Sequence, residues 1–190
     1  MRPFPSGIAV RRSIDGCDGA LEALLADLWP IAFSASRWYG KDRTVAEDVA
    51  QQACLKVALS IHKLKNVESF QTWFLVILLR VLQRESVRLK RWRRAAPTNT
   101  SVATDPVGSE VLMRVAIAKL PSDLRQALLL TKAFGYSSEQ AAYVLKIPAG
   151  TVRYHVCRAK NLLYDSLYTD CGERIREPDR RVTFSRKGAV

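Results

Sequence analysis

The chain contains few of the residues on which catalysis and metal binding usually depend. Its 190 residues include 2 histidines and 4 cysteines. The cysteines, Cys17, Cys54, Cys157 and Cys171, form no CxxC pair and have no zinc-ligand spacing. We therefore expect no metal site and no cofactor, and we interpret the cysteines as reduced thiols of a cytoplasmic protein.

Long apolar runs and enzyme motifs are also missing. No segment approaches the roughly 18 to 20 uninterrupted apolar residues of a membrane span. The start, MRPFPSGIAVRRSIDG, lacks the apolar core and the cleavage site of a secretory signal. There is no glycine-rich phosphate loop, no HxE…PCxxC motif and no helix face of clustered carboxylates. The chain is therefore predicted not to be an enzyme, with no catalytic residues and no small-molecule substrate.

Acidic residues are the scarcer charge. The 18 Asp and Glu residues stand against 30 Lys and Arg, which gives a formal net charge of +12. Such an excess favours a polyanionic partner, either nucleic acid or an anionic membrane surface. The most basic helix also carries apolar residues that are continuous with a plausible core, and this argues against a membrane-surface role.

The apolar residues recur at three and four positions, which predicts an all-α protein. Two small helical domains are expected, an N-terminal helical bundle over 19–94 and a helix-turn-helix domain over 110–168. Segment 95–109, small and polar with two prolines, is interpreted as a flexible linker. An N-terminal extension (1–18) precedes the bundle, and a charged tail (169–190) that we expect to be disordered ends the chain.

Punctuation residues suggest where several helices begin and end. Pro30 should kink or split the first long helix, expected over about 19–39. Thr44 with Glu47, and Ser137 with Gln140, form capping boxes that predict helix starts. The remaining helices are expected at about 44–62, 70–91, 110–119, 121–135 and 137–145, and a final helix follows the 147–150 turn and runs to about 168.

The last helix has two contrasting faces. At about 100° per residue, its apolar side chains gather on one side and its basic, aromatic and amide side chains on the other. The outward set comprises Arg153, Tyr154, Cys157, Arg158 and Asn161. A solvated face would normally include acids, and 148–161 contains none. Arginine and asparagine pair with base edges in the major groove, so this face is predicted to contact DNA.

The helices of the N-terminal domain carry two further candidate surfaces. On the helix from Thr44, one face mixes leucines with polar groups, and periodicity leaves open whether it meets a partner or a neighbouring helix; its members are Asp48, Gln52, Leu55, Lys56 and Leu59. The next helix bears an arginine stripe suited to phosphate neutralisation, formed by Arg80, Arg84, Arg88 and Arg91. Aromatic residues at its start suit the stacking of unpaired bases.

The sequence LPSDLRQALLLTKAFGYSSEQAAYVLKIPAGTVRYHVCRAKNLL resembles the C-terminal domain of bacterial sigma factors. The resemblance implies that Arg153, Tyr154, Cys157 and Arg158 face the −35 promoter element. It also implies phosphate contacts for Ser138 and Thr151. Cys157 departs from the usual chemistry, because a thiol reads bases poorly.

The string AEDVAQQACLKVALSIHKL…ESFQTWFLVILLRVLQRESVRLKR is similar to the second region of sigma factors. With both regions in this order and no third domain between them, the chain resembles an extracytoplasmic-function (ECF) sigma factor. That resemblance implies that the mixed helix face, from Asp48 to Leu59, binds the clamp helices of core RNA polymerase. It further implies a flipped −10 base at Asn66, Ser69 and Phe70, supported by Trp73. Where the family usually shows Arg-Ile-x-x-Asn, this chain has Val-Ile-Leu-Leu-Arg, residues 76–80.

Two functions are therefore weighed. The leading one is a sigma factor that directs core RNA polymerase to promoter DNA and opens it, and family resemblance adds an anti-sigma protein as an expected partner. The alternative is a helix-turn-helix regulator that acts without polymerase. The alternative explains the C-terminal half but leaves the arginine stripe and the mixed helix face without a purpose, and it would usually require a dimer.

Overall fold

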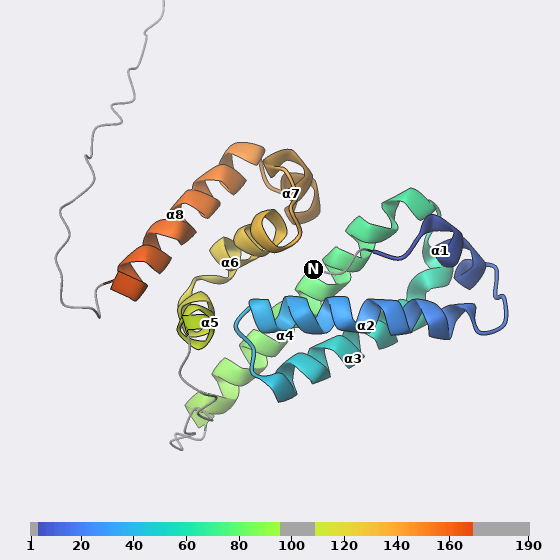
Figure 1. Ribbon diagram of the computed structural model, residues 1–190, viewed down its shortest axis with the longest axis horizontal. Coiled ribbons are helices and arrows are strands. Elements are labelled where there is room, and N and C mark those ends of the chain that lie inside the picture. Colours follow the sequence, from blue (N-terminus) through green and yellow to red (C-terminus); the bar gives the residue numbers. More distant parts are fainter. Residues whose placement is uncertain (1–3, 96–108, 169–190) are drawn as a thin grey trace, which may run out of the picture.

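The computed structural model describes residues 4–95 and 109–168, and this part of the chain is helical without strands (Figure 1). We call the helices before residue 96 the first module and those after residue 108 the second module. The first module contains α1 (Gly7–Ile14), α2 (Ala20–Trp38), α3 (Arg43–Ser60), the 3-10 turns η1 (Ile61–Lys63) and η2 (Val67–Ser69), and α4 (Phe70–Ala95). The second contains α5 (Ser109–Lys119), α6 (Ser122–Leu128), the π-turn η3 (Leu129–Ala133), α7 (Ser138–Leu145) and α8 (Ala149–Tyr168). The predicted all-α class is confirmed.

The core of the first module lies between α2, α3 and α4. Helix α3 presents small side chains to α2, with Ala46, Ala50 and Ala53 fully buried, so the two helix backbones can approach closely. Leu28 and Phe74 are likewise fully buried and fill the space between the helices. Figure 1 shows α2 and α3 lying side by side while α4 crosses them. This packing fixes which sides of α3 and α4 face outward.

The second module is built around α8. Val152 and Ala159 are fully buried on its inner side, as the periodicity predicts, and Leu124 and Leu128 of α6 pack near Ala159. Helix α7 begins with a complete capping box, because the Ser137 hydroxyl accepts from the Gln140 amide (3.2 Å) and the Gln140 side chain accepts from the Ser137 amide (2.9 Å). This predicted helix start is therefore confirmed.

Three expectations about helix boundaries need correction. The capping box at Thr44 is wrong, because the Asp42 carboxylate accepts from the Val45 amide (2.8 Å) and α3 begins at Arg43, one residue earlier than Thr44. Pro30 does not split α2, which runs unbroken through it. The expected helix over 121–135 is two elements, since the α-helical pattern of α6 changes to a π-turn at Leu129.

The N-terminal extension contains a helix that the sequence pattern did not indicate. Helix α1 begins after Ser6, whose hydroxyl accepts from the Ala9 amide (3.3 Å). Val10 on its inner side is almost fully buried. The expected tail (169–190) and residues 96–108 of the expected linker (95–109) lie outside the described residues, while Ala95 ends α4 and Ser109 begins α5. None of the helices in the described part of the chain combines the length and the hydropathy that a bilayer crossing requires.

Candidate polymerase and nucleic-acid interfaces

Helix α8 presents the predicted basic face to solvent. Arg153, Tyr154, Cys157 and Arg158 are all exposed, opposite the buried Val152. Tyr154 is 58% exposed, and an Arg158 guanidinium nitrogen lies 3.4 Å from its hydroxyl oxygen. A row of arginine and tyrosine on a helix-turn-helix is the arrangement that contacts base edges in the major groove.

An acidic residue borders this face, and the local sequence of α8 gave no sign of it. Glu139 of α7 accepts from a guanidinium nitrogen of Arg153 at 3.1 Å, across 14 residues of sequence. Hydrogen bonds from its own backbone amide and from the Ser137 side chain, together with the charge of Arg153, lower the pKa of Glu139. Glu139 therefore stays ionised beside a side chain that is predicted to meet DNA.

A hollow of 410 Å³ lies beside the same face. Ser138, the first residue of α7, lines it together with Arg153 and Cys157. Lys132 and Lys160 also line it and are exposed; sequence reasoning did not single them out. Thr151 sits in the first turn of α8 and is half-buried. The first turn of a helix with cations nearby suits phosphate binding.

The outer face of α3 is largely open to solvent, and Arg88 of α4 borders it at a hollow lined by Asp48, Gln52 and Leu55. Leu55 is 59% and Leu59 66% exposed, and Gln52 is exposed between turns. Asp48 and Lys56 on this face are half-buried. The sequence left open whether these leucines pack inside the domain; the structure excludes internal packing for them. Exposed leucines among polar groups indicate a protein-binding surface.

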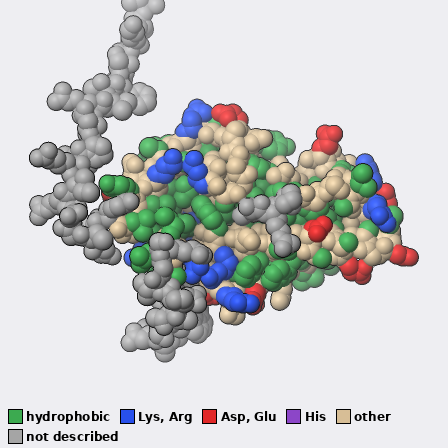
Figure 2. Space-filling view, viewed as in Figure 1, with side chains coloured by type: hydrophobic (Ala, Val, Ile, Leu, Met, Phe, Trp, Pro, Cys, Tyr) green, Lys and Arg blue, Asp and Glu red, His purple; other side chains and the backbone are tan. Residues whose placement is uncertain are grey.

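The arginine stripe runs along the solvent side of α4. Arg80, Arg84, Arg88 and Arg91 are exposed, as predicted. Arg88 has an acidic neighbour, since its Nε lies 2.8 Å from the buried carboxylate of Glu85. In Figure 2, basic side chains lie over the second module and over the lower part of the first, and acidic side chains are more numerous at the end near α1, where basic ones are present as well. The arginine stripe is suited to a phosphate backbone.

The predicted base-binding residues lie close together at the start of α4, but they are not equally exposed to solvent. Asn66 is exposed, and its side chain accepts from the Glu68 amide (2.9 Å). The Ser69 hydroxyl donates to the Asn66 carbonyl (2.7 Å). Phe70 is only 3% exposed, because its spacing of four from Phe74 turns it into the core. Its contact with a base stays a prediction, and in this structure it packs behind Trp73, at 6.0 Å between ring centroids.

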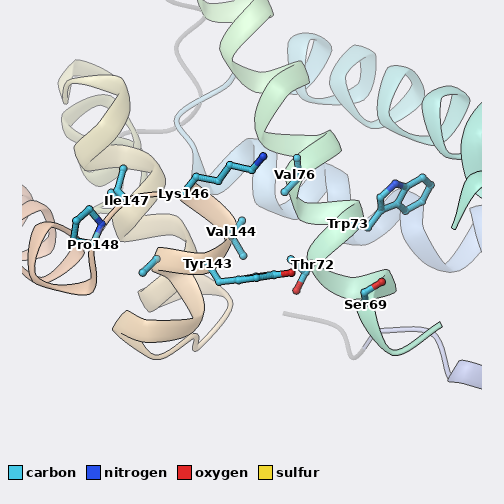
Figure 3. A pocket seen from close by; sticks show the side chains of 10 residues that line it. Ser69, Thr72, Trp73, Val76, Tyr143, Val144, Lys146, Ile147 and Pro148 are labelled. Carbon is cyan, nitrogen blue, oxygen red and sulfur yellow. The ribbon is translucent and has the colours of Figure 1, made fainter. Parts of the chain in front are cut away.

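A cavity of 810 Å³ lies between this region and the second module. Ser69, Thr72 and Trp73 of the first module line one side of it; Tyr143 and Lys146 are among the residues of the other side. Figure 3 shows Tyr143 extending from α7 toward Thr72. Val76, one of the apolar departures from the family pattern, lines the same cavity. Its apolar side chain suits a surface that faces another part of the chain.

The described cysteines are free thiols with different accessibility. Cys17 and Cys157 are exposed, whereas Cys54 is half-buried and its thiol lies 3.8 Å from the Leu25 carbonyl. Burial raises the pKa of Cys54. Across residues 4–95 and 109–168, no group of three His, Cys, Asp or Glu side chains comes together as a metal site requires.

Both modules match known protein families. Residues 24–94 match the family model for sigma-70 region 2, and residues 110–163 match that for sigma-70 region 4. The chain is 33% identical over 156 residues to the ECF RNA polymerase sigma factor EcfG of Rhodopseudomonas palustris, covering 78% of this chain and 84% of that protein. It is 34% identical over 155 residues to the ECF RNA polymerase sigma factor SigC of Mycobacterium tuberculosis, covering 76% and 81%.

A solved structure shares the fold. It contains the sigma factor RpoE of Bartonella quintana in complex with the anti-sigma factor NepR. The match has a TM-score of 0.64 and 23% sequence identity, and it covers 78% of this chain and 97% of that one. Two matched sigma-70 regions in the expected order, together with relatives that align across both of them, identify the family. The chain belongs to the extracytoplasmic-function family of RNA polymerase sigma factors.

Proposed function

We propose that this sigma factor binds core RNA polymerase through the outer face of α3, reads the −35 element with α8 and holds the melted −10 strand at the start of α4. It acts in the cytoplasm as a non-catalytic subunit, because its role is to position the polymerase and to stabilise the open promoter. The division into two DNA-binding modules joined by residues 95–109 belongs to the same proposal.

The observation that carries this proposal is the exposure of Leu55 and Leu59. Two leucines one helical turn apart, more than half exposed, indicate a protein-binding surface, which a sigma factor uses for polymerase and which a regulator would use only to form a dimer. Across a polymerase interface they would be buried, and each buried leucine contributes about 1.5–3 kcal/mol from its removal from water.

The −10 assignment follows from the positions of three kinds of side chain. Asn66 and Ser69 offer hydrogen-bonding groups at the base-binding end, Trp73 offers an aromatic face, and the arginines of α4 continue away from it toward residue 91. Extruding a base costs a few kcal/mol, which stacking and phosphate neutralisation can offset. Family membership also makes an anti-sigma protein an expected partner, as NepR is for RpoE of Bartonella quintana.

Binding to core polymerase tests the proposal. The double variant Leu55→Ala with Leu59→Ala should bind core enzyme at least tenfold more weakly than the native chain, measured by fluorescence titration. Leu112→Ala is the matched control, because Leu112 is a 55% exposed leucine on α5, away from α3. Unchanged binding by the double variant, with its helix content intact by circular dichroism, would rule out this face of α3.

A further inference from the structure

Phe4, ahead of α1, touches both modules. Its ring centroid lies 6.0 Å from that of Phe74 in α4, with the ring planes at 75°. On the other side it lies 5.9 Å from the ring of Phe134, which follows η3 in the second module. Edge-to-face and tilted pairs at these distances are attractive beyond simple burial.

The segment that carries Phe4 is anchored to the first module. The Ser13 hydroxyl donates to the Ala20 carbonyl (2.9 Å), which ties α1 to the start of α2. Val10 is 1% exposed in the first-module core, and Gly7 packs against Val67 of η2. With α1 fixed in this way, the Phe4 ring is a fixed projection of the first module that meets Phe134.

A second contact between the modules lies at the end of α2. The Arg125 guanidinium of α6 stacks over the Tyr39 ring, 4.7 Å from its centroid, and one of its nitrogens is 3.5 Å from the Tyr39 carbonyl oxygen. Arg125 is 7% exposed, so this cation–π pair is largely removed from water. Nearby, Gly40 lies against Ala118, and a Cβ at Gly40 would be 2.7 Å from that of Ala118.

The closed arrangement brings the proposed −10 and −35 regions too close together for a promoter. Ser69 and Trp73 line the same cavity as Ile147 and Pro148, which immediately precede α8. Base pairs rise 3.4 Å each along B-DNA, so two elements about 25 positions apart are separated by roughly 80 Å of duplex. A molecule in which both regions border one cavity cannot contact both elements, and the modules must separate first.

We propose that Phe4 is an intramolecular clasp: it holds the two modules closed in the free protein by seating between Phe74 and Phe134, and it leaves the Phe134 side when the modules separate on polymerase. The closed state rests on contacts within the chain alone. Only the consequence for promoter binding rests on the proposed function. The outer face of α3 stays exposed in the closed state, so polymerase can bind before the clasp opens.

The chain supplies its own pair of probes for this motion. Cys17 in the first module and Cys157 in the second are exposed thiols. With Cys54→Ser and Cys171→Ser, spin labels at these two sites report the distance between the modules by double electron–electron resonance. For this labelled chain with native Phe4 and Phe134, which we call the background, we expect one short and narrow distribution of label-to-label distances. Phe4→Ala should move a clear share of the population to longer distances, and Phe134→Ala should do the same, while the Arg125–Tyr39 contact keeps the remainder closed.

Four comparisons make the test decisive. Ile8→Ala is the matched control, because Ile8 is an apolar residue of the same segment but 76% exposed, and it should leave the distance unchanged. The double variant of Phe4 and Phe134 should add little to either single one, since both remove the same contact. Helix content measured by circular dichroism distinguishes separation of the modules from unfolding. Phe4→Leu keeps part of the apolar side-chain volume, so it should shift the distance less than Phe4→Ala.

The spin-labelled chain with native Phe4 and Phe134 is then measured with core polymerase. The clasp predicts the long distance in that complex. A Phe4→Ala protein that stays folded with the same short distance as the background would overturn the clasp, whatever its polymerase binding. If the distance between the modules depends on Phe4 but the chain fails to bind core enzyme, the proposed function is contradicted and the clasp stands.

Discussion

The carboxylate of Glu139 on α7 lies 3.1 Å from the guanidinium of Arg153 on α8. One acidic side chain therefore occupies part of the basic face of α8 that we propose as the DNA contact. The pair is well exposed, with 62% and 69% of the two side chains accessible, so it contributes little to stability. Its effect should be felt in DNA binding, where the carboxylate competes with phosphates and base edges for Arg153.

Glu139→Gln should strengthen duplex binding. Removal of the charge frees Arg153 and removes repulsion from the phosphate backbone, and we expect roughly a threefold gain in affinity at low salt that shrinks as salt rises. Fluorescence anisotropy with a labelled duplex measures it. Glu22→Gln removes an exposed acid of α2 in the other module and serves as the control; an equal gain there would show that only net charge matters.

Acidification should reproduce this gain only at low pH. The pKa of Glu139 is lowered, so its carboxylate keeps its charge until the pH falls below the ordinary range for glutamate. Duplex affinity of the native chain relative to Glu139→Gln should be constant through neutral and mildly acidic pH, and the two should converge only below it. Convergence near the ordinary glutamate pKa or above would contradict the observed hydrogen bonds to this carboxylate.

The arginine stripe predicts a defined salt dependence. Arg84→Ala and Arg91→Ala should each lower the slope of log affinity against log salt concentration by about 0.7–0.9, the value for one lost phosphate contact. Arg43→Ala is the control, because Arg43 is an exposed arginine paired with Glu47 on the first turn of α3. Slopes that stay unchanged in the α4 variants would remove this helix from the DNA path.

A side chain at Gly40 should disturb the contact between the two modules. It has φ +85°, and an added Cβ would lie 2.7 Å from the Cβ and 2.9 Å from the backbone of Ala118. Gly40→Ala should therefore separate the modules and raise the radius of gyration above the about 16 Å of a compact chain of this length, measured by small-angle X-ray scattering. Gly16→Ala shares the positive φ (+73°) but meets no atom within 4 Å, and it should leave the radius unchanged.

The described cysteines should react with iodoacetamide in a fixed order. Burial raises the pKa of Cys54, so less thiolate is present at any given pH, and its alkylation should be slower than that of Cys17 and Cys157 and should begin at higher pH. Mass spectrometry after timed alkylation checks this order. Labelling of Cys54 as fast as Cys17 would show that α2 and α3 separate readily in solution.

Periodic sequence features predicted the fold and the outward faces well. The inner sides of α3 and α8 are where the apolar period placed them. Each residue turns a helix by about 100°, so Val49 and Val152 fall on the same side as the other apolar residues of their helices, and both are buried. The Ser137 capping box is a local motif and was likewise predictable. Asp42 rather than Thr44 caps α3. The two residues lie two positions apart, and the path of the chain into the helix decides which side chain accepts from the free backbone amides.

Contacts between distant segments could not be predicted in this way. Helix α1 is eight residues long, too short for a clear period, and its position depends on Val10 and Ser13 packing on α2. The Phe4–Phe134 and Arg125–Tyr39 pairs join residues far apart in sequence. The helical spacing of four from Phe74 places Phe70 on the core side, where it is buried, whereas the family resemblance places it at a flipped base.

Promoter opening tests the assignment most directly. Holoenzyme reconstituted with this chain is offered genomic fragments, and a bound promoter is probed with permanganate for unpaired thymines in its −10 region. We predict reactivity that requires core polymerase and is lost both in Leu55→Ala with Leu59→Ala and in Arg153→Ala with Arg158→Ala. Sequence-specific duplex binding by the chain alone, with no permanganate reactivity when core enzyme is added, would contradict the assignment and favour a helix-turn-helix regulator.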